Sequence, residues 1–512
     1  KGHGSGHYMS ALAFAFASCS SPEANLIQEK KSYLCHKICS KSKSNMNIQF
    51  LGAAKEVTGS KHLITTPKGK KILLDCGMYQ GKGLETDSLN RELGFEPSEI
   101  DYLILSHPHI DHSGLIPYIV KNGFNGTIYS TPAARDLCAI MLQDSANIQE
   151  FDTKTFNKKR DKQGLPPVEP IYTVSDARDA MNCFVSVPYG KTFFLDEETS
   201  IRFTDNGHIL GSATVVLSIK KEDKSVVKIG FSGDVGRYTK RILRVPQKFE
   251  QVDYMIMEST YGDREHSDVD RSEQELLRAV IDTCCKKKGK LLIPSFAIGR
   301  AQEIIYALNR LWEKKLLPQI EVYVDSPLSM SATNIMRLHE ECFNDDIKEF
   351  MKEDPDPFGF EKLHYVRSTA ESKQLNYTRI PCIIISASGM MEAGRIKHHI
   401  ANNIENNRTT ILSVGYCAPT TLGAKILRGD QYVSIFGIRH KVNAEIRRID
   451  AYSAHADKNE LLRYLSCQDK SKIQKLILVH GEEETQNNLA QTLQENGYEN
   501  VYIPEKGAVL EI

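Results

Sequence analysis

One stretch of the chain, Ser106-His107-Pro108-His109-Ile110-Asp111-His112-Ser113-Gly114, places three histidines and one aspartate within six positions. It directly follows the apolar run Tyr102–Leu105, which predicts a β-strand. In an extended segment His107 and His109 project to the same side. The turn that follows can direct Asp111 and His112 toward a second ion. Because imidazoles combined with a carboxylate are typical ligands of a zinc ion that activates water, this stretch predicts a metal centre at a strand end.

The alternative interpretation of these histidines is a surface cluster that binds no metal. The chain contains 16 histidines, and chance would place His-x-His-x-Asp-His in on the order of one sequence of this length per thousand. We therefore favour the metal site over the surface cluster.

Turns after other predicted strands hold further candidate ligands. His208 lies in Asp205–Ser212, and Asp234 lies in Phe231–Gly236, each beside glycines that let a loop approach an ion closely. Either residue alone is more typical of an ordinary turn. Together with the histidine-rich stretch they complete a site for two ions, in which one carboxylate can bridge. Asp75, at the end of the strand predicted over 72–74, is a candidate acceptor that orients an imidazole N–H.

The chain changes character along its length. From Met46 to about Phe249, short alternating runs predict a sheet-rich region with few helices. From Asp253 to about Val442, short apolar runs alternate with helix-length stretches, which predicts a doubly wound α/β domain with a parallel sheet. The last part again resembles the first, with a helix around Lys458–Leu465 and a strand before His480. The sequence therefore predicts one domain that is interrupted by another.

With these features the chain resembles the metallo-β-lactamase superfamily and, within it, the β-CASP nucleases. The resemblance covers residues 46 to 512 and extends to the following motifs: Glu258-Ser259-Thr260-Tyr261-Gly262, Ser453-Ala454-His455-Ala456-Asp457, Val479-His480-Gly481-Glu482, Pro294–Arg300, Asp325-Ser326-Pro327 and Ser386–Met390. It implies an αβ/βα sandwich interrupted by a doubly wound parallel-sheet β-CASP domain. The expected domains are 46–252 and 446–512 for the sandwich and 253–445 for the insertion, whose first strand would end at Glu258. The chain looks like the compact bacterial members, which are related to the cleavage and polyadenylation endonuclease subunit.

The resemblance implies a set of ligands for two zinc ions per chain. His107, His109 and His208 would hold one zinc. Asp111, His112 and His480 would hold the other, and Asp234 would bridge the two ions. In β-CASP enzymes that act on RNA the position of His480 is histidine, whereas in the DNA-directed branch it is usually valine. The resemblance therefore predicts a ribonuclease with single-stranded RNA as its partner.

The implied reaction is hydrolysis of a phosphodiester bond to a 5′ phosphate and a 3′ hydroxyl, expected to be endonucleolytic. Water attacks phosphorus while Asp111 accepts a hydrogen bond from it. His455 protonates the departing 3′ oxygen, and Glu258 keeps His455 cationic, since a carboxylate partner raises a histidine pKa. Arg300 is expected to contact a substrate phosphate as a fork donor, with a solvent-facing arginine at a helix start as the alternative. Ser386 and Ser388 are the other expected substrate contacts.

Composition limits the partners of this chain. Lys+Arg and Asp+Glu each number 65, so the formal net charge is zero and any nucleic-acid contact must be local. Hydrophobic residues make up 41% and charged residues 25%, which predicts a globular chain with a sizeable core. No apolar run approaches the roughly 18 residues of a membrane span. The 12 cysteines form no CxxC pair, which favours a cytoplasmic location. No obligate protein partner is evident, and a homo-oligomer is left open.

Two segments are expected to lie outside this scheme. Lys1–Tyr8 has the composition of a purification tag, and the leader up to residue 45 is polar and aperiodic after the short apolar run Ala11–Ala17, so we expect 1–45 to lie outside the fold. Residues 152–170, rich in lysine, arginine and proline, are interpreted as a solvated surface loop in preference to an RNA contact.

Two other functions are compatible with part of the sequence. The first is a small-molecule hydrolase of the same metal fold, such as a thioesterase, a lactonase or a β-lactamase. Only the motifs of the first domain support it, because those enzymes lack the insertion. The second is a non-catalytic scaffold subunit, which the complete set of candidate ligands disfavours.

Overall fold

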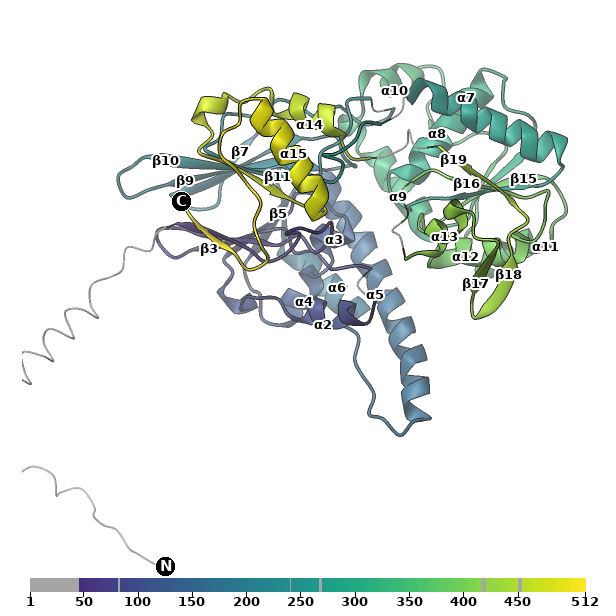
Figure 1. The fold of residues 1–512 in the computed structure, drawn as a ribbon, viewed down its shortest axis with the longest axis horizontal. Coiled ribbons are helices and arrows are strands. Elements are labelled where there is room, and N and C mark those ends of the chain that lie inside the picture. The colour runs from purple at the N-terminus through teal and green to yellow at the C-terminus, as the bar shows by residue number, and fades with distance from the viewer. Residues whose placement is uncertain are drawn as a thin grey trace, which may run out of the picture. The chain divides into compact units, whose positions relative to one another are not determined.

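Two seven-stranded sheets carry the predicted site (Figure 1). The computed structural model describes residues 46–512 apart from 82, 240, 267–268, 416, 418–419 and 450–453, and the predicted tag and leader lie outside the described residues. The first sheet has the order β22-β1-β2-β3-β4-β5-β6. Its strands are β1 (Asn47–Phe50), β2 (His62–Thr65), β3 (Lys71–Leu74), β4 (Tyr102–Ile104), β5 (Thr127–Ser130), β6 (Phe184–Ser186) and β22 (Val509–Glu511).

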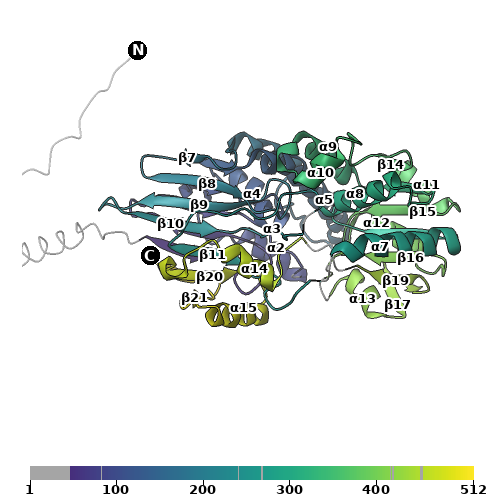
Figure 2. The same cartoon turned by 90° about the horizontal axis from the view of Figure 1, so that it is seen from above.

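The second sheet has the order β21-β20-β11-β10-β9-β8-β7, and its strands follow one another in this order in Figure 2. They are β7 (Thr192–Phe194), β8 (Thr199–Asp205), β9 (Ala213–Lys220), β10 (Val226–Phe231), β11 (Tyr254–Glu258), β20 (Lys475–Val479) and β21 (Val501–Tyr502). Strands β10, β11, β20 and β21 run parallel to one another. Their carboxyl ends therefore meet at one edge of the sheet.

The inner faces of the two sheets form a shared hydrophobic core. Ile48 and Phe50 of β1 alternate with less buried residues, as expected for a strand with one face in the core. They belong to the same buried cluster as Val215 and Leu217 of β9 and Phe231 of β10. Full burial of side chains of this size stabilises the fold by about 1.5–3 kcal/mol each. The two sheets therefore form a sandwich around this core.

Helices cover both outer faces of the sandwich, which gives the predicted αβ/βα order. On the first sheet Ile116 and Ala177 pack against buried residues such as Leu73 and Leu103. On the second sheet Leu461 and Leu489 pack against the outward-facing residues of β11 and β20. The covering helices are α2 (Thr86–Arg91), α3 (Ile110–Ser113), α4 (Ile116–Lys121), α5 (Pro132–Asp161) and α6 (Val174–Ala180) on the first side, with α14 (Lys458–Leu465) and α15 (Glu483–Glu495) on the second.

Helix α5 corrects two expectations. The region up to Phe249 was predicted to hold few helices, and residues 152–170 were predicted to form a loop, but α5 runs for 30 residues and ends only at Asp161. Its start has a simple cause. The Thr131 side chain accepts a hydrogen bond from the Ala134 N–H, and Pro132 occupies the first turn, where its missing N–H costs nothing. In Figure 1 the second half of α5 extends away from both sheets.

A third sheet lies in the inserted part of the chain. It has six strands in the order β14-β13-β15-β12-β16-β19, and all of its strand pairs are parallel. The strands are β12 (Lys290–Pro294), β13 (Glu321–Val324), β14 (Leu363–Tyr365), β15 (Cys382–Ser386), β16 (Thr410–Ser413) and β19 (Glu445–Arg448). Helix α7 (Val269–Val280) precedes these strands. The helices between them are α8 (Arg300–Glu313), α9 (Pro327–Leu338), α10 (Asp345–Phe350), α11 (Thr369–Tyr377), α12 (Gly394–Asn403) and α13 (Leu422–Arg428), and β17 (Tyr432–Ile435) pairs with β18 (Ile438–Lys441) as a hairpin.

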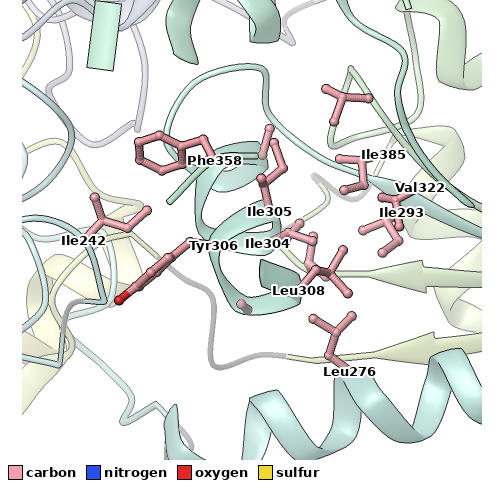
Figure 3. Close-up of a cluster of buried hydrophobic side chains, with 14 of the residues drawn as sticks. Ile242, Leu276, Ile293, Ile304, Ile305, Tyr306, Leu308, Val322, Phe358 and Ile385 are labelled. Atoms are coloured by element: carbon pink, nitrogen blue, oxygen red, sulfur yellow. The ribbon is translucent and has the colours of Figure 1, made fainter. Parts of the chain in front are cut away.

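The core of this part shows why these segments alternate. Strands β12 and β15 are buried along their whole length, as is typical of parallel strands that helices cover on both faces. Figure 3 shows Ile304, Ile305 and Leu308 of α8 packed near Ile293 and Ile385 of these strands. The result is the predicted doubly wound α/β arrangement.

Two strands lie elsewhere than expected. The strand Tyr254–Glu258 was predicted to be the first inserted strand, but β11 pairs with β10 and β20 and belongs to the second sheet. Residues from 446 on were expected to belong to the last part of the chain, but β19 (Glu445–Arg448) pairs with β16 in the third sheet. By strand pairing, the inserted part is bounded by β12 and β19. No helix within the described ranges has the length and apolar composition that crossing a bilayer requires.

Candidate metal centre and proton donor

The predicted ligands come from strand ends that meet at one edge of the sandwich. Asp234 follows β10, Glu258 ends β11 and His480 follows β20, which are parallel neighbours. In the first sheet Asp75 and His107 follow the parallel neighbours β3 and β4. Because parallel strands present their carboxyl ends at the same edge, the topology brings these distant positions together.

Four side chains form the first group of potential ligands. His107 Nε2 lies 3.1 Å from His109 Nδ1, and His208 Nε2 lies 3.2 Å from the same His109 atom. Asp234 Oδ2 lies 3.4 Å from His107 Nε2 and 3.5 Å from His208 Nε2. Ligands about 2.0–2.1 Å from a tetrahedral zinc ion are about 3.3–3.4 Å from each other. The four atoms therefore have the spacing that a zinc ion requires.

Asp111, His112 and His480 form the second group. His112 Nε2 lies 3.3 Å from His480 Nε2, which in turn lies 3.6 Å from Asp111 Oδ2. This spacing is again close to that of ligands around one zinc ion. The two groups contain all the histidines and aspartates that the sequence predicts as metal ligands.

Asp234 lies between the two groups. Its Oδ2 faces His107 and His208, whereas its Oδ1 lies 3.2 Å from His112 Nε2. Oδ1 is buried and accepts no hydrogen bond from the described part of the protein. A buried carboxylate oxygen without a donor is costly, and a bound cation removes this cost. The donor set therefore fits a pair of metal ions that share the Asp234 carboxylate.

Burial keeps most of the first group in the form that binds metal. It lowers the pKa of His107 to about 3 and that of His109 to about 4, and it lowers the pKa of His208 well below its ordinary value. For Asp234 burial alone would raise the pKa, but His112, His480 and other nearby imidazoles outweigh it, so the pKa lies well below the usual range. Neutral imidazoles and an ionised carboxylate are the protonation states of metal ligands.

Asp75 holds the backbone and one imidazole of the site. Its Oδ2 lies 2.6 Å from His112 Nδ1, and its two oxygens accept hydrogen bonds from the N–H and hydroxyl of Ser106. Asp75 has a positive φ of 57°, a left-handed conformation that aspartate tolerates better than most residues. With Nδ1 engaged by Asp75, His112 presents Nε2 to the second group.

His455 and Glu258 form a pair beside the first group. His455 Nδ1 lies 3.1 Å from Glu258 Oε2 and 4.0 Å from Asp234 Oδ2. Burial alone would lower the pKa of His455, but the charges of Glu258 and Asp234 outweigh it and raise the pKa to about 9. Glu258 is fully buried, and its Oε1 also accepts from the Val235 N–H. Ser453 of the same motif lies outside the described residues.

Two positions that the sequence did not single out support His480. The Thr260 hydroxyl lies 3.1 Å from His480 Nδ1 and donates to the His480 carbonyl at 3.2 Å. The His480 N–H donates to the Ala53 carbonyl at 2.7 Å. These contacts hold His480 at a positive φ of 52°, which a histidine seldom adopts. Thr260 belongs to the quoted Glu258–Gly262 motif, whereas nothing in the sequence points to Ala53.

The three residues expected to contact the substrate, Arg300, Ser386 and Ser388, do not all have donor groups that face solvent. Arg300 begins α8, but it is buried, and its Nη1 pairs with Glu303, so it is neither a solvent-facing arginine nor an open fork. The Ser386 side chain is buried and donates to the Asp325 carbonyl at 2.7 Å. Ser388 is partly exposed, with its hydroxyl 3.4 Å from the backbone of Ala393.

A loop of the insertion lies close to the metal centre. At Gly299 an added Cβ would lie 3.6 Å from Ile209 Cγ2, so the loop before α8 lies beside the residue that follows His208. From the other side Gly236 bridges with His455, and the Ala456 N–H donates to the Val235 carbonyl at 2.8 Å. Both the insertion and the last part of the chain therefore border the predicted ligands.

Three family comparisons match separate parts of the chain. Residues 59–178 match the metallo-beta-lactamase superfamily, and residues 301–426 match the Beta-Casp domain. Residues 439–504 match the Zn-dependent metallo-hydrolase RNA specificity domain. These segments include the histidine-rich stretch, most of the third sheet, and both His455 and His480.

Individual proteins are similar over most of the chain. Ribonuclease TTHA0252 of Thermus thermophilus is 33% identical over 439 residues, which cover 86% of this chain and 94% of that protein. Transcription termination factor FttA of Methanosarcina mazei is 28% identical over 485 residues, which cover 92% of this chain and 73% of that protein. A crystal structure of a protein of unknown function from Enterococcus faecalis covers 92% of this chain with a TM-score of 0.52 at 14% identity, which shows a similar fold.

Proposed function

Because the chain belongs to the metallo-beta-lactamase superfamily and carries its Beta-Casp and RNA specificity domains, we propose that it cleaves single-stranded RNA internally at a centre of two zinc ions. Family membership makes the chain a metal-dependent hydrolase that acts on RNA. The two-ion count, the ligands of each ion and the roles of individual side chains are the proposal. The observation that carries it is the Asp234 carboxylate, which has one oxygen toward each group of ligands.

The residues assigned to each ion follow from the spacing of their atoms. His107, His109 and His208 would hold one zinc ion, and Asp111, His112 and His480 would hold the other. Asp234 would serve both ions. When bound, two zinc ions lower the pKa of water from about 15.7 to about 7 and offset the charge of the phosphodiester. The low pKa values of His107 and His109, which keep both imidazoles neutral at physiological pH, support this assignment.

The chain's own residues would then handle the protons. Asp111 is partly exposed at the edge of the second group and would accept a hydrogen bond from the attacking water. His455, with Glu258 on Nδ1, has its other nitrogen free of Glu258 and would donate a proton from it to the departing 3′ oxygen. The products would be a 5′ phosphate and a 3′ hydroxyl. Glu258 would act by keeping the His455 ring oriented and cationic.

Recognition of the RNA strand is expected at the border between the insertion and the sandwich. The Gly299 loop and the Ser388 turn belong to the insertion, and the first of these lies close to Ile209 beside the ligands. Because Arg300 and Ser386 are engaged inside the protein, Ser388 is the one of the three predicted contacts that we retain for substrate binding. We place the activity in the cytoplasm and assign no obligate protein partner.

The test is a cleavage assay on internally and end-labelled single-stranded RNA with matched DNA, using the parental protein, Asp111→Ala and the control Asp179→Ala. Asp179 is exposed on α6, far in sequence from any predicted ligand. We expect internal RNA cuts with 5′ phosphates from the parent and the control and none from Asp111→Ala, with two zinc ions per parental chain. Parental protein that holds metal and cuts thioesters or lactones but no RNA would support the small-molecule hydrolase instead.

A further inference from the structure

The second half of α5 presents one face that the protein leaves exposed. On it lie Phe151, whose exposed fraction is 70%, and four exposed lysines. We call this face the basic stripe, defined as Phe151, Lys154, Lys158, Lys159 and Lys162. Residues three and four positions apart lie on the same side of a helix, so the stripe is continuous along the helix. Figure 1 shows that this half of α5 extends beyond the sheets.

The basic stripe continues a face that has a packing role in the first half of α5. Ala133 and Leu137 belong to the core cluster of the insertion, Ile140 packs against that cluster, and α5 packs against α9 there. The same side of the helix then runs through Ile148, which is 50% exposed, to Phe151. This face of α5 contacts the insertion in the first half of the helix. In the second half, no part of the protein that the structure describes covers it.

The opposite side of α5 is covered by the segment that returns from its end. Asn157 Nδ2 donates to the Val168 carbonyl, and the Val168 N–H donates to Asn157 Oδ1, both at 2.9 Å. Arg160 Nε donates to the Pro166 carbonyl at 2.7 Å, and its guanidinium lies over the Phe156 ring. These contacts fix the helix end in place. The return segment therefore covers one side of the helix and leaves the basic stripe exposed.

The charges around the stripe are strongly unequal. Residues 152–163 contain the cations Lys154, Lys158, Lys159, Arg160 and Lys162 and the anions Asp152 and Asp161. Within the described ranges none of the four stripe lysines forms an ion pair, whereas Lys55, Lys70, Arg91 and Lys286 elsewhere in the fold do. In a chain of zero net charge, this is a local concentration of positive charge on a rigid element.

We propose that the basic stripe binds the RNA strand at a distance from the bond that is cut, an inference that rests on the proposed function. Lysines spaced along a helix match the regular charges of a phosphate backbone, and an exposed phenylalanine among them offers a surface on which a base stacks. A second copy of this chain is a poorer occupant, because it would bring like charges together. The stripe contacts no reacting atom and therefore acts through affinity.

The length of α5 sets the size of RNA that reaches the stripe. The helix starts beside the metal centre, since the Thr131 hydroxyl donates to the Gly211 carbonyl at 2.6 Å, three residues after His208. From Pro132 to Lys154 a helix rises about 33 Å at 1.5 Å per residue. A stacked strand covers this span with about ten nucleotides at about 3.4 Å each. Only RNA longer than this can contact both the stripe and the metal centre.

The experiment compares two full-length variants that each lose four lysines. The stripe variant is Lys154→Gln, Lys158→Gln, Lys159→Gln and Lys162→Gln, in which glutamine keeps the helix propensity. The control variant is Lys191→Gln, Lys220→Gln, Lys221→Gln and Lys224→Gln, with Lys191 just before β7 and the other three at the β9–β10 turn of the second sheet. Phe151→Ala tests the stacking surface separately. Binding is measured as Kd against salt with RNAs of about 6 and about 30 nucleotides, lengths on either side of the span above.

We expect the stripe variant to raise the Kd of the longer RNA by about ten-fold at low salt, and to reduce the salt slope by about 0.7 per lost phosphate contact. The ratio of affinities for long and short RNA should fall in the stripe variant and in Phe151→Ala, and should stay at the parental value in the control variant. Circular dichroism verifies the fold of each protein. Parental affinity of the stripe variant for the longer RNA overturns the proposal.

Two further outcomes separate this inference from the function on which it rests. One outcome is that the parent cuts RNA while the stripe variant keeps the parental RNA affinity and differs from the parent only in the mass of its assembly, measured by light scattering. In that case the stripe is an interface between copies of the chain, and the RNA proposal is wrong. If the parent neither binds nor cuts RNA of either length, the proposed function itself fails, and the stripe proposal fails with it. If the parent cuts RNA and the stripe variant binds the longer RNA with the parental affinity, the stripe proposal is wrong and the proposed function stands.

Discussion

His112 Nδ1 lies 2.6 Å from Asp75 Oδ2 in the interior of the protein, and His112 Nε2 faces Asp234 and His480. One imidazole thus has one nitrogen held by a buried carboxylate and the other directed at the predicted metal centre. Such a pair fixes the tautomer and the ring orientation and makes the free nitrogen a better ligand. Asp75 is therefore a positioning residue for the second group of ligands.

Replacement of this carboxylate should weaken metal binding without unfolding the protein. Asp75→Asn removes the charge but keeps a side chain that tolerates the positive φ of 57°. We expect zinc affinity at the second group to fall by about 10–100-fold, measured by competition with a chromophoric chelator. Asp179→Asn, on the exposed side of α6, is the matched control. Parental zinc affinity in Asp75→Asn would show that His112 is oriented by its other neighbours.

The pair formed by His455 and Glu258 should affect turnover and not metal content. His455→Ala should retain zinc and lose about 10²–10⁴-fold in kcat, which is the usual contribution of a general acid. Glu258→Gln should lose less, because the His455 ring remains. Single-turnover cleavage and metal analysis on the same preparations test both statements. If His455→Ala cleaves at nearly the parental rate, the proton donor is another group.

Gly77 should tolerate no side chain. A Cβ added there would lie 1.6 Å from the Asp111 carbonyl oxygen, which also accepts from the Ser60 N–H at 2.8 Å. Gly77→Ala must therefore displace the backbone that carries Asp111, and we expect an overpacking cost of about 1–3 kcal/mol with loss of zinc from the second group. Gly415→Ala, whose Cβ would meet only the Phe296 ring, at 3.9 Å, among the described residues, is the control. Thermal unfolding and zinc stoichiometry measure the two effects, and full metal content in Gly77→Ala would contradict the expectation.

Lys61 should make stability depend on pH in the alkaline range. It is fully buried, donates to the Gly59 and Gly77 carbonyls, and burial lowers its pKa from 10.5 to about 8. Between these two values the folded state holds fewer protons than the unfolded state, so the free energy of unfolding rises with pH. The full rise attributable to Lys61 is about 3 kcal/mol at 1.36 kcal/mol per pKa unit.

Urea unfolding of the parent and of Lys61→Met between pH 7.5 and 10.5, the range set by the two pKa values, isolates this contribution. Other lysines and tyrosines titrate in both proteins and cancel in the difference. We expect the gap between the two profiles to change steadily across the range. Parallel profiles would show that the Lys61 amine keeps an ordinary pKa inside the fold.

Sequence alone predicts the parts of the site that are local or that follow directly from strand ends. His107, His109, Asp111 and His112 lie in one short stretch, so their proximity needs no tertiary information. The apolar run Tyr102–Leu105 predicts a strand, and β4 forms there over Tyr102–Ile104. The inclusion of His480 and the division of the ligands between two ions came from the resemblance to a family and not from the spacing of the residues.

The expectations that the structure corrects depend on tertiary partners. A short apolar run such as Tyr254–Glu258 looks the same in either sheet, and only its pairing with β20 reveals where it belongs. Arg300 and Ser386 are a separate case: their roles as substrate contacts stay predictions, while Glu303 and the Asp325 carbonyl engage their donors in the fold. The second half of α5 was interpreted as part of a loop over 152–170, because the apolar residues that mark a buried face thin out after Ile148.

The parallel pairing of β11 with β20 also determines the order in which the sheets can form while the chain is synthesised. After β11 has been synthesised, residues 259 to 474 must follow before β20, its second neighbour, is made. This takes on the order of ten to forty seconds at about 5–20 residues per second. During that interval β11 is an open sheet edge, able to pair with other chains, while the third sheet can already be complete. A nascent chain halted there lacks His480, so the second group of predicted ligands is complete only after residue 480 has been synthesised.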